Sequence, residues 1–292
     1  MYRTALLGLL VGCANSAEPR KKKPADTDTD TATVLEPAPL VPVADDCPDF
    51  LVESGELEFT VDGLERSGLI YLPDELEDGA PLVLVWHGRT GSPTAMEKKM
   101  NLSGIAAATG AVVIAPASLD PRGTVWSNYP EEPDWALIDA LRTCAVEELG
   151  ADIRRVHTTG FSAGGFFVTL QVLDYADVFA SATVYSAGTD DEMNPYRTPA
   201  WLLPVLVSWG TDGDEVFHDD TLFDMPALGG DFAENLAADG HLTVVCPHPD
   251  GHVVPEAVDE IGELWFSQHV FGEPSPFADQ SEGLPDYCGT LE

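Results

Sequence analysis

The sequence predicts an α/β domain with a mostly parallel β-sheet of about eight strands and helices on both of its faces. From about Cys47 onward, short apolar runs of strand length alternate with longer segments of helical periodicity. The first two strand-like runs have no helical segment between them, which indicates an antiparallel start to the sheet. The length of residues 47–292 suits one domain of this class.

The expected strands are rich in Val, Ile, Leu and aromatic residues and are bounded by polar residues, Gly or Pro. In chain order they span residues 57–61, 69–72, 82–86, 111–115, 156–159, 180–185, 205–209 and 242–246. The expected helices span about residues 94–109, 134–149, 163–173, 232–238 and 257–269. In the clearest of them, 134–149, apolar residues recur at three- and four-residue spacing: Leu137, Ile138, Leu141, Cys144 and Ala145.

The chain is strongly acidic, with 50 Asp and Glu residues against 14 Lys and Arg and a formal net charge of −36. Five basic residues and one acid lie in the first 23 positions, so the rest carries 9 basic and 49 acidic residues, a net charge of −40. Phosphate binding requires a basic surface, so nucleic acid is excluded as a partner. The same surface repels anionic lipids and substrates, and we therefore expect a neutral or cationic substrate.

Residues 1–13 have the features of a lipoprotein signal peptide. Arg3 precedes an apolar run, residues 5–12, that is too short to span a bilayer. The run ends in Leu-Val-Gly-Cys, which resembles a bacterial lipobox and makes Cys13 the expected lipidated residue; an ordinary secretory signal is the alternative. Residues 14–46, rich in Asp, Thr and Pro, are expected to form a disordered tether. We therefore expect a bacterial cell-envelope protein, lipid-anchored at the outer membrane or cell surface, or a secreted one. Its membrane contact would be through the lipid anchor alone.

Four further cysteines, an even number, predict two disulfides in an exported protein. They are Cys47, Cys144, Cys246 and Cys288. Three pairings are possible and the sequence leaves them open. Because Cys47 opens the predicted domain and Cys288 nearly ends it, a bridge between the chain ends is one expectation. No Cys-x-x-Cys spacing is present, and neither a metal nor a cofactor is expected.

A Gly-x-Ser-x-Gly motif, centred on Ser162, lies between an expected strand and an expected helix. In this setting the serine occupies a sharp, strained turn, and Gly160 and Gly164 allow strand and helix to approach closely. The N-terminus of the helix adds oriented N–H groups beside the serine oxygen. Ser162 is therefore a candidate nucleophile; a plain turn in which the serine caps the helix is the alternative.

A nucleophilic serine needs a base, and the base needs an orienting carboxylate. His252 follows the last expected strand, at the sheet edge where Ser162 also lies, and His248 is its main rival. His218 and His269 are expected at the surface.

The carboxylate is expected after the strand 205–209, where Asp212 and Asp214 follow, with Asp190 as a more distant candidate. The chain order Ser162, Asp214, His252 is that of α/β-hydrolases.

Stabilising an oxyanion takes two backbone N–H donors. Ala163, directly after Ser162, supplies one, and the Gly-containing loop after the strand 82–86 is expected to supply the other. Trp126, Asn128 and Tyr129 lie on the loop after the strand 111–115 and are candidates either for lining a substrate pocket or for packing.

These motifs together resemble the polyhydroxybutyrate depolymerase and feruloyl esterase group of α/β-hydrolases over residues 68–270. The resemblance rests on four segments: Trp86-His87-Gly88, residues 152–156 leading into 160–165, Trp209-Gly210 with an Asp soon after, and Cys246-x-His248-x-x-Gly251-His252.

The resemblance implies Ser162 as nucleophile, His252 as base and Asp214 as orienting acid, with the N–H groups of Arg89 and Ala163 as the oxyanion hole. The spacing after Gly210 departs from the family's Gly-Thr-x-Asp, which keeps Asp212 open. Arg89 stands where polymer-active members often carry Cys, which keeps a polymer substrate open.

The expected function is two-step acyl transfer by an exported serine hydrolase that cleaves carboxylic esters, like a feruloyl or acetyl esterase or a polyester depolymerase. The acidic surface favours a neutral ester, linked to a polysaccharide or within a polyester. A serine peptidase of the same fold and a catalytically silent surface binding module are the alternatives.

Overall fold

The computed structural model describes residues 35–43, 45, 47, 54–120, 126–128, 132–191, 194–218, 220–278 and 282–291. The predicted signal peptide with Cys13, most of the predicted tether, and Tyr129 lie outside the described residues. The described residues belong to one folded unit, Leu35–Glu292. Within them, no helix has both the length and the apolar character that crossing a membrane requires.

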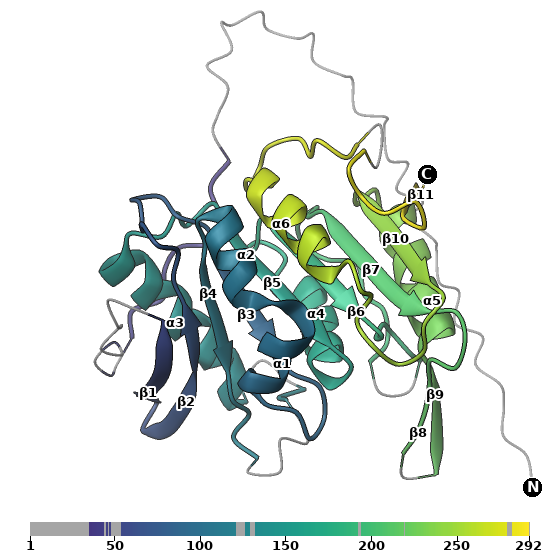
Figure 1. Cartoon of the computed structure of the whole chain (residues 1–292), viewed down its shortest axis with the longest axis horizontal. Helices are drawn as coiled ribbons and strands as arrows, with labels where there is room; N and C mark the ends of the chain where they lie inside the picture. Colours follow the sequence, from purple (N-terminus) through teal and green to yellow (C-terminus); the bar gives the residue numbers. More distant parts are fainter. Residues whose placement is uncertain are drawn as a thin grey trace, which may run out of the picture. The chain divides into compact units, whose positions relative to one another are not determined.

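Nine strands of the described chain form one sheet, in the order β1-β2-β4-β3-β5-β6-β7-β10-β11 (Figure 1). They are β1 (Gly55–Val61), β2 (Leu64–Tyr71), β3 (Leu82–Trp86), β4 (Val112–Pro116), β5 (Val156–Phe161), β6 (Ser181–Tyr185), β7 (Val205–Gly210), β10 (Thr243–His248) and β11 (Gly289–Leu291). From β4 through β3, β5, β6 and β7 to β10 neighbouring strands are parallel. The pairs β1–β2, β2–β4 and β10–β11 are antiparallel. The predicted mostly parallel sheet with an antiparallel start is thus confirmed.

Helices cover both faces of this sheet, as predicted. They are α1 (Pro93–Met100), α2 (Leu102–Thr109), α3 (Pro133–Leu149), α4 (Ala163–Asp174), α5 (Met225–Ala238) and α6 (Val258–Gln268). Apolar residues of α3, α4 and α5 fill the core on one face, and those of α1, α2 and α6 fill it on the other (Figure 1). Strands β3 and β4 are buried along their whole length, which is why they are continuously apolar rather than alternating.

The helix predicted over residues 94–109 is instead two helices, α1 and α2, separated at Asn101. This residue has a left-handed φ of 51°, and its N–H donates to the carbonyl of Glu97, which closes α1. Asn is one of the few side chains that adopts this conformation readily. A single polar residue inside an apolar stretch gave too weak a signal to predict the break.

Two further strands, β8 (Glu215–His218) and β9 (Thr221–Asp224), form a separate antiparallel hairpin. It projects beyond the main sheet at the edge where β7 ends (Figure 1). The sequence did not predict it, because its polar and acidic residues hide the two-residue periodicity of a strand. Helix α5 starts at Met225 rather than at 232, because the Asp224 carboxylate accepts the Ala227 N–H and caps the helix there.

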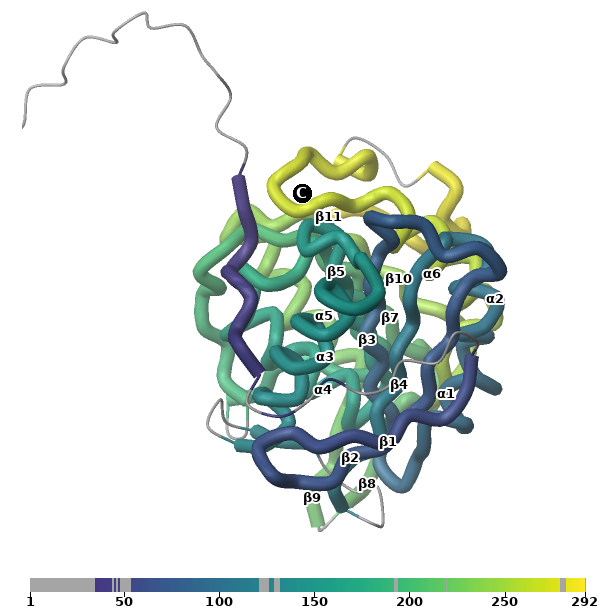
Figure 2. The backbone as a smooth tube through the Cα atoms, turned by 90° about the vertical axis from the view of Figure 1, so that its left-hand side faces the viewer, coloured from purple at the N-terminus to yellow at the C-terminus, as the bar shows by residue number. Residues whose placement is uncertain are grey.

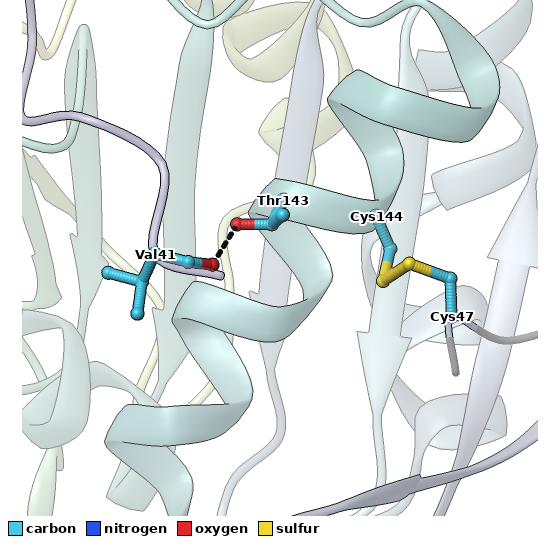
Figure 3. Close-up of a disulfide and its surroundings, with 4 residues drawn as sticks. All are labelled: Val41, Cys47, Thr143 and Cys144. Carbon is cyan, nitrogen blue, oxygen red and sulfur yellow. Dashed lines mark hydrogen bonds between the residues drawn. A yellow bond between two sulfur atoms is a disulfide. The ribbon is translucent and has the colours of Figure 1, made fainter. Parts of the chain in front are cut away.

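Residues 35–43, which the sequence assigned to the tether, are bonded to the domain, and we call them the N-terminal strap. The Thr143 hydroxyl of α3 donates to the Val41 carbonyl at 2.9 Å (Figure 3). The buried guanidinium of Arg142, also on α3, donates to the Ala38 carbonyl. The strap runs extended beside the domain (Figure 2). The folded unit therefore begins with the strap, upstream of the predicted boundary.

Two disulfides are present, as predicted, and they join Cys47 to Cys144 (Figure 3) and Cys246 to Cys288. The expected bridge between the chain ends is wrong. The strap runs along α3, which contains Cys144, so it brings Cys47 to that helix. Cys288 directly precedes β11, which pairs with β10, the strand that contains Cys246.

Two histidines lie buried where β5 begins and α6 ends, and the expectation that His269 lies at the surface is wrong. His157 is fully buried, with Nδ1 2.9 Å from the Ser181 hydroxyl. His269 is 1 % exposed; its Nδ1 lies 2.8 Å from the Trp265 carbonyl and its Nε2 2.7 Å from the Ser275 hydroxyl. Burial lowers the pKa of His157 well below its ordinary value and that of His269 to about 4.

These buried imidazoles predict acid lability. A lowered pKa in the folded state stabilises the fold fully above the ordinary histidine pKa near 6.5, and this stabilisation is lost as the pH falls towards 4. Each unit of pKa difference corresponds to about 1.4 kcal/mol. We expect His269→Asn to lose less stability than the wild type between pH 7 and pH 5, as measured by urea unfolding. Equal slopes for the variant and the wild type would contradict the prediction.

Candidate active site

Ser162 lies in the turn between β5 and α4, in a backbone conformation that few residues adopt. Its φ and ψ are 55° and −119°, and such strain concentrates at functional sites. The neighbouring glycines are required sterically. A Cβ at Gly164 would lie 2.0 Å from the Trp86 carbonyl oxygen, and one at Gly160 would lie 2.3 Å from the Gly164 oxygen. The turn therefore requires glycine at both positions 160 and 164 of the Gly-x-Ser-x-Gly motif.

Three predicted residues meet at the edge where β5, β7 and β10 end. His252 Nε2 lies 2.9 Å from the Ser162 hydroxyl, and His252 Nδ1 lies 2.6 Å from Asp214 Oδ1. A carboxylate only accepts, so Nδ1 carries a proton and Nε2 faces the serine as an acceptor. This arrangement allows the hydroxyl proton to pass to the imidazole while the carboxylate holds the ring in place.

The environment of Asp214 distinguishes it from the other candidate acids. Its side chain is fully buried, and Oδ2 accepts a hydrogen bond from the Gly210 N–H and one from the Ser186 hydroxyl, both at 2.8 Å. These bonds satisfy the buried charge and leave Oδ1 for His252. Asp212 is exposed, and the backbone of Asp190 pairs with that of Asn194 in an isolated β-bridge.

Ser186 is a site residue that the sequence analysis missed. It directly follows β6 and has a φ of 49°. The sequence held a signal for Ser186, because a polar residue after a buried strand at this edge of the sheet is typical of a site residue. The hydrogen bond from its hydroxyl to Asp214 could be found only in the folded structure.

His248, the rival base, is buried at the end of β10, with Nδ1 3.8 Å from an Asp250 carboxylate oxygen. It is not the imidazole that faces Ser162.

The loop after β3 passes directly over the serine. A Cβ at Gly88 would lie 3.3 Å from the Ser162 Cβ, so the backbone that leads into Arg89 packs against Ser162. Ala163 is the first residue of α4, where an N–H has no partner within the helix. Both predicted backbone donors, those of Arg89 and Ala163, therefore belong to segments that border Ser162.

His87 holds this loop in place from its buried side. Its Nδ1 lies 2.9 Å from the Gly88 carbonyl, and its Nε2 accepts the Ser118 N–H at 3.1 Å. Since the carbonyl only accepts and the amide only donates, the imidazole is neutral with its proton on Nδ1. Burial lowers the pKa of His87 and favours the same form.

The predicted substrate-binding residue Trp126 is buried. It is 5 % exposed, and its indole N–H donates to the His87 carbonyl at 2.8 Å. Its ring packs edge-on against Trp86 and stacks on Phe167. Trp126 therefore supports the loop after β3 from the core side. Asn128 is exposed, with its N–H bonded to Glu132.

Within the described ranges, no group of three or more His, Cys, Asp or Glu residues lies together so that it could hold a metal ion.

Comparison with known proteins gives relatives by sequence, although no family model matches the chain. The chain is 31 % identical over 245 residues to "Putative esterase NocK" of Nocardia uniformis subsp. tsuyamanensis, which covers 77 % of this chain and 67 % of that protein. It is 27 % identical over 124 residues to feruloyl esterase B of Thermothelomyces thermophilus, covering 40 % of this chain. That match spans 42 % of the fungal protein's length.

Solved structures share the fold at low sequence identity. Native sOPH superposes with a TM-score of 0.68 at 16 % identity, over 84 % of this chain and 96 % of that one. An acetyl xylan esterase from Aspergillus awamori gives a TM-score of 0.54 at 16 % identity, over 69 % of this chain and 94 % of that one. The predicted α/β-hydrolase fold is confirmed.

The two bonds of His87 predict its protonation state. We expect the His87 ring to stay neutral, with its proton on Nδ1, at about pH 6, where an ordinary imidazole is mostly charged. Histidine ¹⁵N NMR measures this directly, and His87→Asn identifies the signals by their loss. A His87 imidazolium spectrum at that pH would show that the assigned bonds are absent in solution.

Proposed function

The chain belongs to the polyhydroxybutyrate depolymerase and feruloyl esterase group of α/β-hydrolases and is a carboxylic ester hydrolase, and we propose that it works by acyl transfer through Ser162, His252 and Asp214. The observation that carries this proposal is the unbroken chain of hydrogen bonds from the Ser162 hydroxyl through His252 to the buried Asp214 carboxylate. Its position at the carboxyl ends of parallel strands is where α/β folds place reacting groups.

In the proposed first step, Ser162 Oγ attacks the ester carbonyl carbon while His252 Nε2 takes the hydroxyl proton. Asp214 stays ionised and stabilises the imidazolium that forms. The negative charge on the carbonyl oxygen is stabilised by the N–H groups of Arg89 and Ala163. The C–O bond to the alcohol then breaks, and His252 returns the proton to the leaving oxygen. Water attacks the acyl-enzyme by the same route and releases the acid.

We propose that the protein is exported, with residues 1–13 as signal peptide and Cys13 as the lipidated residue. The two disulfides support this, because such bonds persist in oxidising compartments outside the cytosol. The location in the bacterial cell envelope, anchored by lipid or secreted, is part of the same proposal. The net charge of −36 supports the absence of nucleic acid among the partners.

For the substrate, we propose an ester on a polysaccharide or within a polyester. A relative named feruloyl esterase supports the first class. The alternative function, a serine peptidase, would cleave amide bonds rather than ester bonds. A peptide amide is therefore included in the test. A silent binding module would keep the fold and would hydrolyse none of the substrates.

Ser162→Ala tests the mechanism. Removing the nucleophile should lower the hydrolysis of p-nitrophenyl acetate and methyl ferulate by about six orders of magnitude, leaving background rates. A peptide amide should remain intact with both proteins. Circular dichroism provides the folding control. Ester turnover that survives in the variant would refute the assignment of Ser162.

The orienting acid is tested by a matched pair of variants. Asp214→Asn should lower kcat by about four orders of magnitude, because an amide cannot hold the required histidine tautomer. Asp212→Asn also removes one carboxylate charge, but from an exposed side chain two residues before Asp214. This variant should leave kcat within about twofold. The reverse order of effects would identify Asp212 as the acid.

A further inference from the structure

An ion pair that is buried on both sides joins β2 to the start of α3. Arg66 Nη1 donates to Asp134 Oδ1 at 2.7 Å, and the two side chains are 1 % and 6 % exposed. Arg66 Nη2 also donates to the Pro133 carbonyl at 2.7 Å. Because both charges lose their water, such a pair adds little to stability, and what it does supply is a fixed arrangement of the groups that it joins.

The second oxygen of Asp134 holds Ser127. Oδ2 accepts the Ser127 N–H at 2.9 Å and the Ser127 hydroxyl at 3.0 Å. In return, the Ser127 oxygen accepts the Asp134 N–H at 3.1 Å, a group of the first turn of α3 that has no partner within the helix. Arg66 occupies Oδ1 and leaves Oδ2 to Ser127. Three hydrogen bonds to one helical residue therefore fix the position of Ser127.

Trp126 passes this constraint on to the loop after β3. It directly precedes Ser127, and its indole N–H donates to the His87 carbonyl at 2.8 Å. The peptide unit that contains this carbonyl is followed by the one that carries the Arg89 N–H, the proposed donor to the oxyanion. The indole of Trp126 thus holds the backbone one peptide unit before that donor.

The loop depends on such bonds because its own sequence gives it little rigidity. It contains Gly88 and Gly91, and glycine backbone is conformationally permissive. A backbone donor stabilises the transition state only when it lies at hydrogen-bond distance from the oxyanion, and loss of one donor lowers kcat by about 10²- to 10³-fold. A small displacement of this loop therefore affects the rate.

We propose that Asp134 is a positioning residue for the reaction, which acts through Ser127 and Trp126 to hold the Arg89 N–H at the oxyanion. Arg66 orients the carboxylate. Two side chains separate Asp134 from the loop that carries the donor, so Asp134 affects the rate without contacting the substrate. This inference rests on the proposed acyl transfer at Ser162.

The bond from Trp126 is tested by a matched pair of variants with p-nitrophenyl acetate. Trp126→Phe removes the indole N–H and keeps an aromatic ring. We expect kcat to fall about tenfold, part of the loss for a missing donor, and KM to stay within about twofold, because the oxyanion forms only in the transition state. Trp265→Phe is the control and should leave kcat unchanged. This indole is also fully buried, and its N–H has no hydrogen-bond partner within the described residues.

Asp134→Asn tests the start of the path. The amide keeps the shape of the side chain but replaces one of the two acceptor oxygens by a donor. It cannot accept from Arg66 on one side and from Ser127 on the other, so kcat should fall about tenfold here too. Because Asp134 and Trp126 act along one path, the double variant should lose about as much as either single variant. Independent effects would multiply to about a hundredfold.

The same path predicts a signature in the resting protein. The ¹H–¹⁵N resonance of the Trp126 indole, identified by its loss in Trp126→Phe, should shift in Asp134→Asn. The indole resonance of Trp265, identified in the same way, should stay in place. Urea unfolding at the assay pH verifies that each variant is folded.

A milder variant is available if Asp134→Asn does not fold. Ser127→Ala removes the hydroxyl bond to Oδ2 and keeps the bond from the Ser127 N–H. It takes the place of Asp134→Asn in the double-variant comparison and should lower kcat about threefold, as expected for one hydrogen bond.

Three results would overturn the inference. They are an unchanged kcat in folded Trp126→Phe, an equal loss of kcat in Trp126→Phe and Trp265→Phe, and losses that multiply in the double variant. Any of these, alongside wild-type turnover that Ser162→Ala abolishes, would leave the proposed function intact. No ester turnover by the wild type would overturn both.

Discussion

The active site depends on one steric constraint, the close approach of the start of α4 to the end of β3. A single Cβ at Gly164 would collide with the Trp86 carbonyl oxygen at 2.0 Å. This approach brings the loop after β3 and the start of α4 together at Ser162, so both segments that carry the candidate N–H donors border this residue. The other side stays open for His252. Once the turn is formed, the loops after β7 and β10 need to contribute only one side chain each.

Site residues that belong to a contiguous sequence motif could be predicted from the sequence. Those whose role depends on residues far away in the chain could not. Ser162 and its flanking glycines form a contiguous motif, and the helical and strand periodicities located most elements of the fold. The choice between Asp212 and Asp214 depended on burial and on bonds from Ser186, which follows β6, and from Gly210, the last residue of β7. For the same reason, four cysteines predicted two disulfides but not their pairing. Trp126 gave the same aromatic signal as a substrate-binding residue, although its ring belongs to the core.

Net charge and local charge answer different questions about this protein. The excess of acids acts over the whole surface and excludes polyanions, which must contact many positions at once. A small substrate meets only the few groups around Ser162, so the net charge of the whole surface does not decide how it binds. The neutral state of the His87 imidazole is another local effect of charge. A charged ring beneath this loop would need a buried counter-ion, whereas the neutral ring fixes the loop through the Gly88 carbonyl and the Ser118 N–H.

The connectivity of the two disulfides determines how a mechanical load would pass through the domain. A pull on the chain upstream of the strap enters at Cys47 and crosses directly to Cys144, 97 residues further on. The covalent ring between them contains β1 to β4 and the loop with Arg89, which are therefore bypassed by the force. The second ring, Cys246–Cys288, spans 42 residues and encloses His252. Stretching the chain from its ends would thus act first on the segment between the rings, where Ser162 and Asp214 lie, while the oxyanion loop and the base are mechanically shielded.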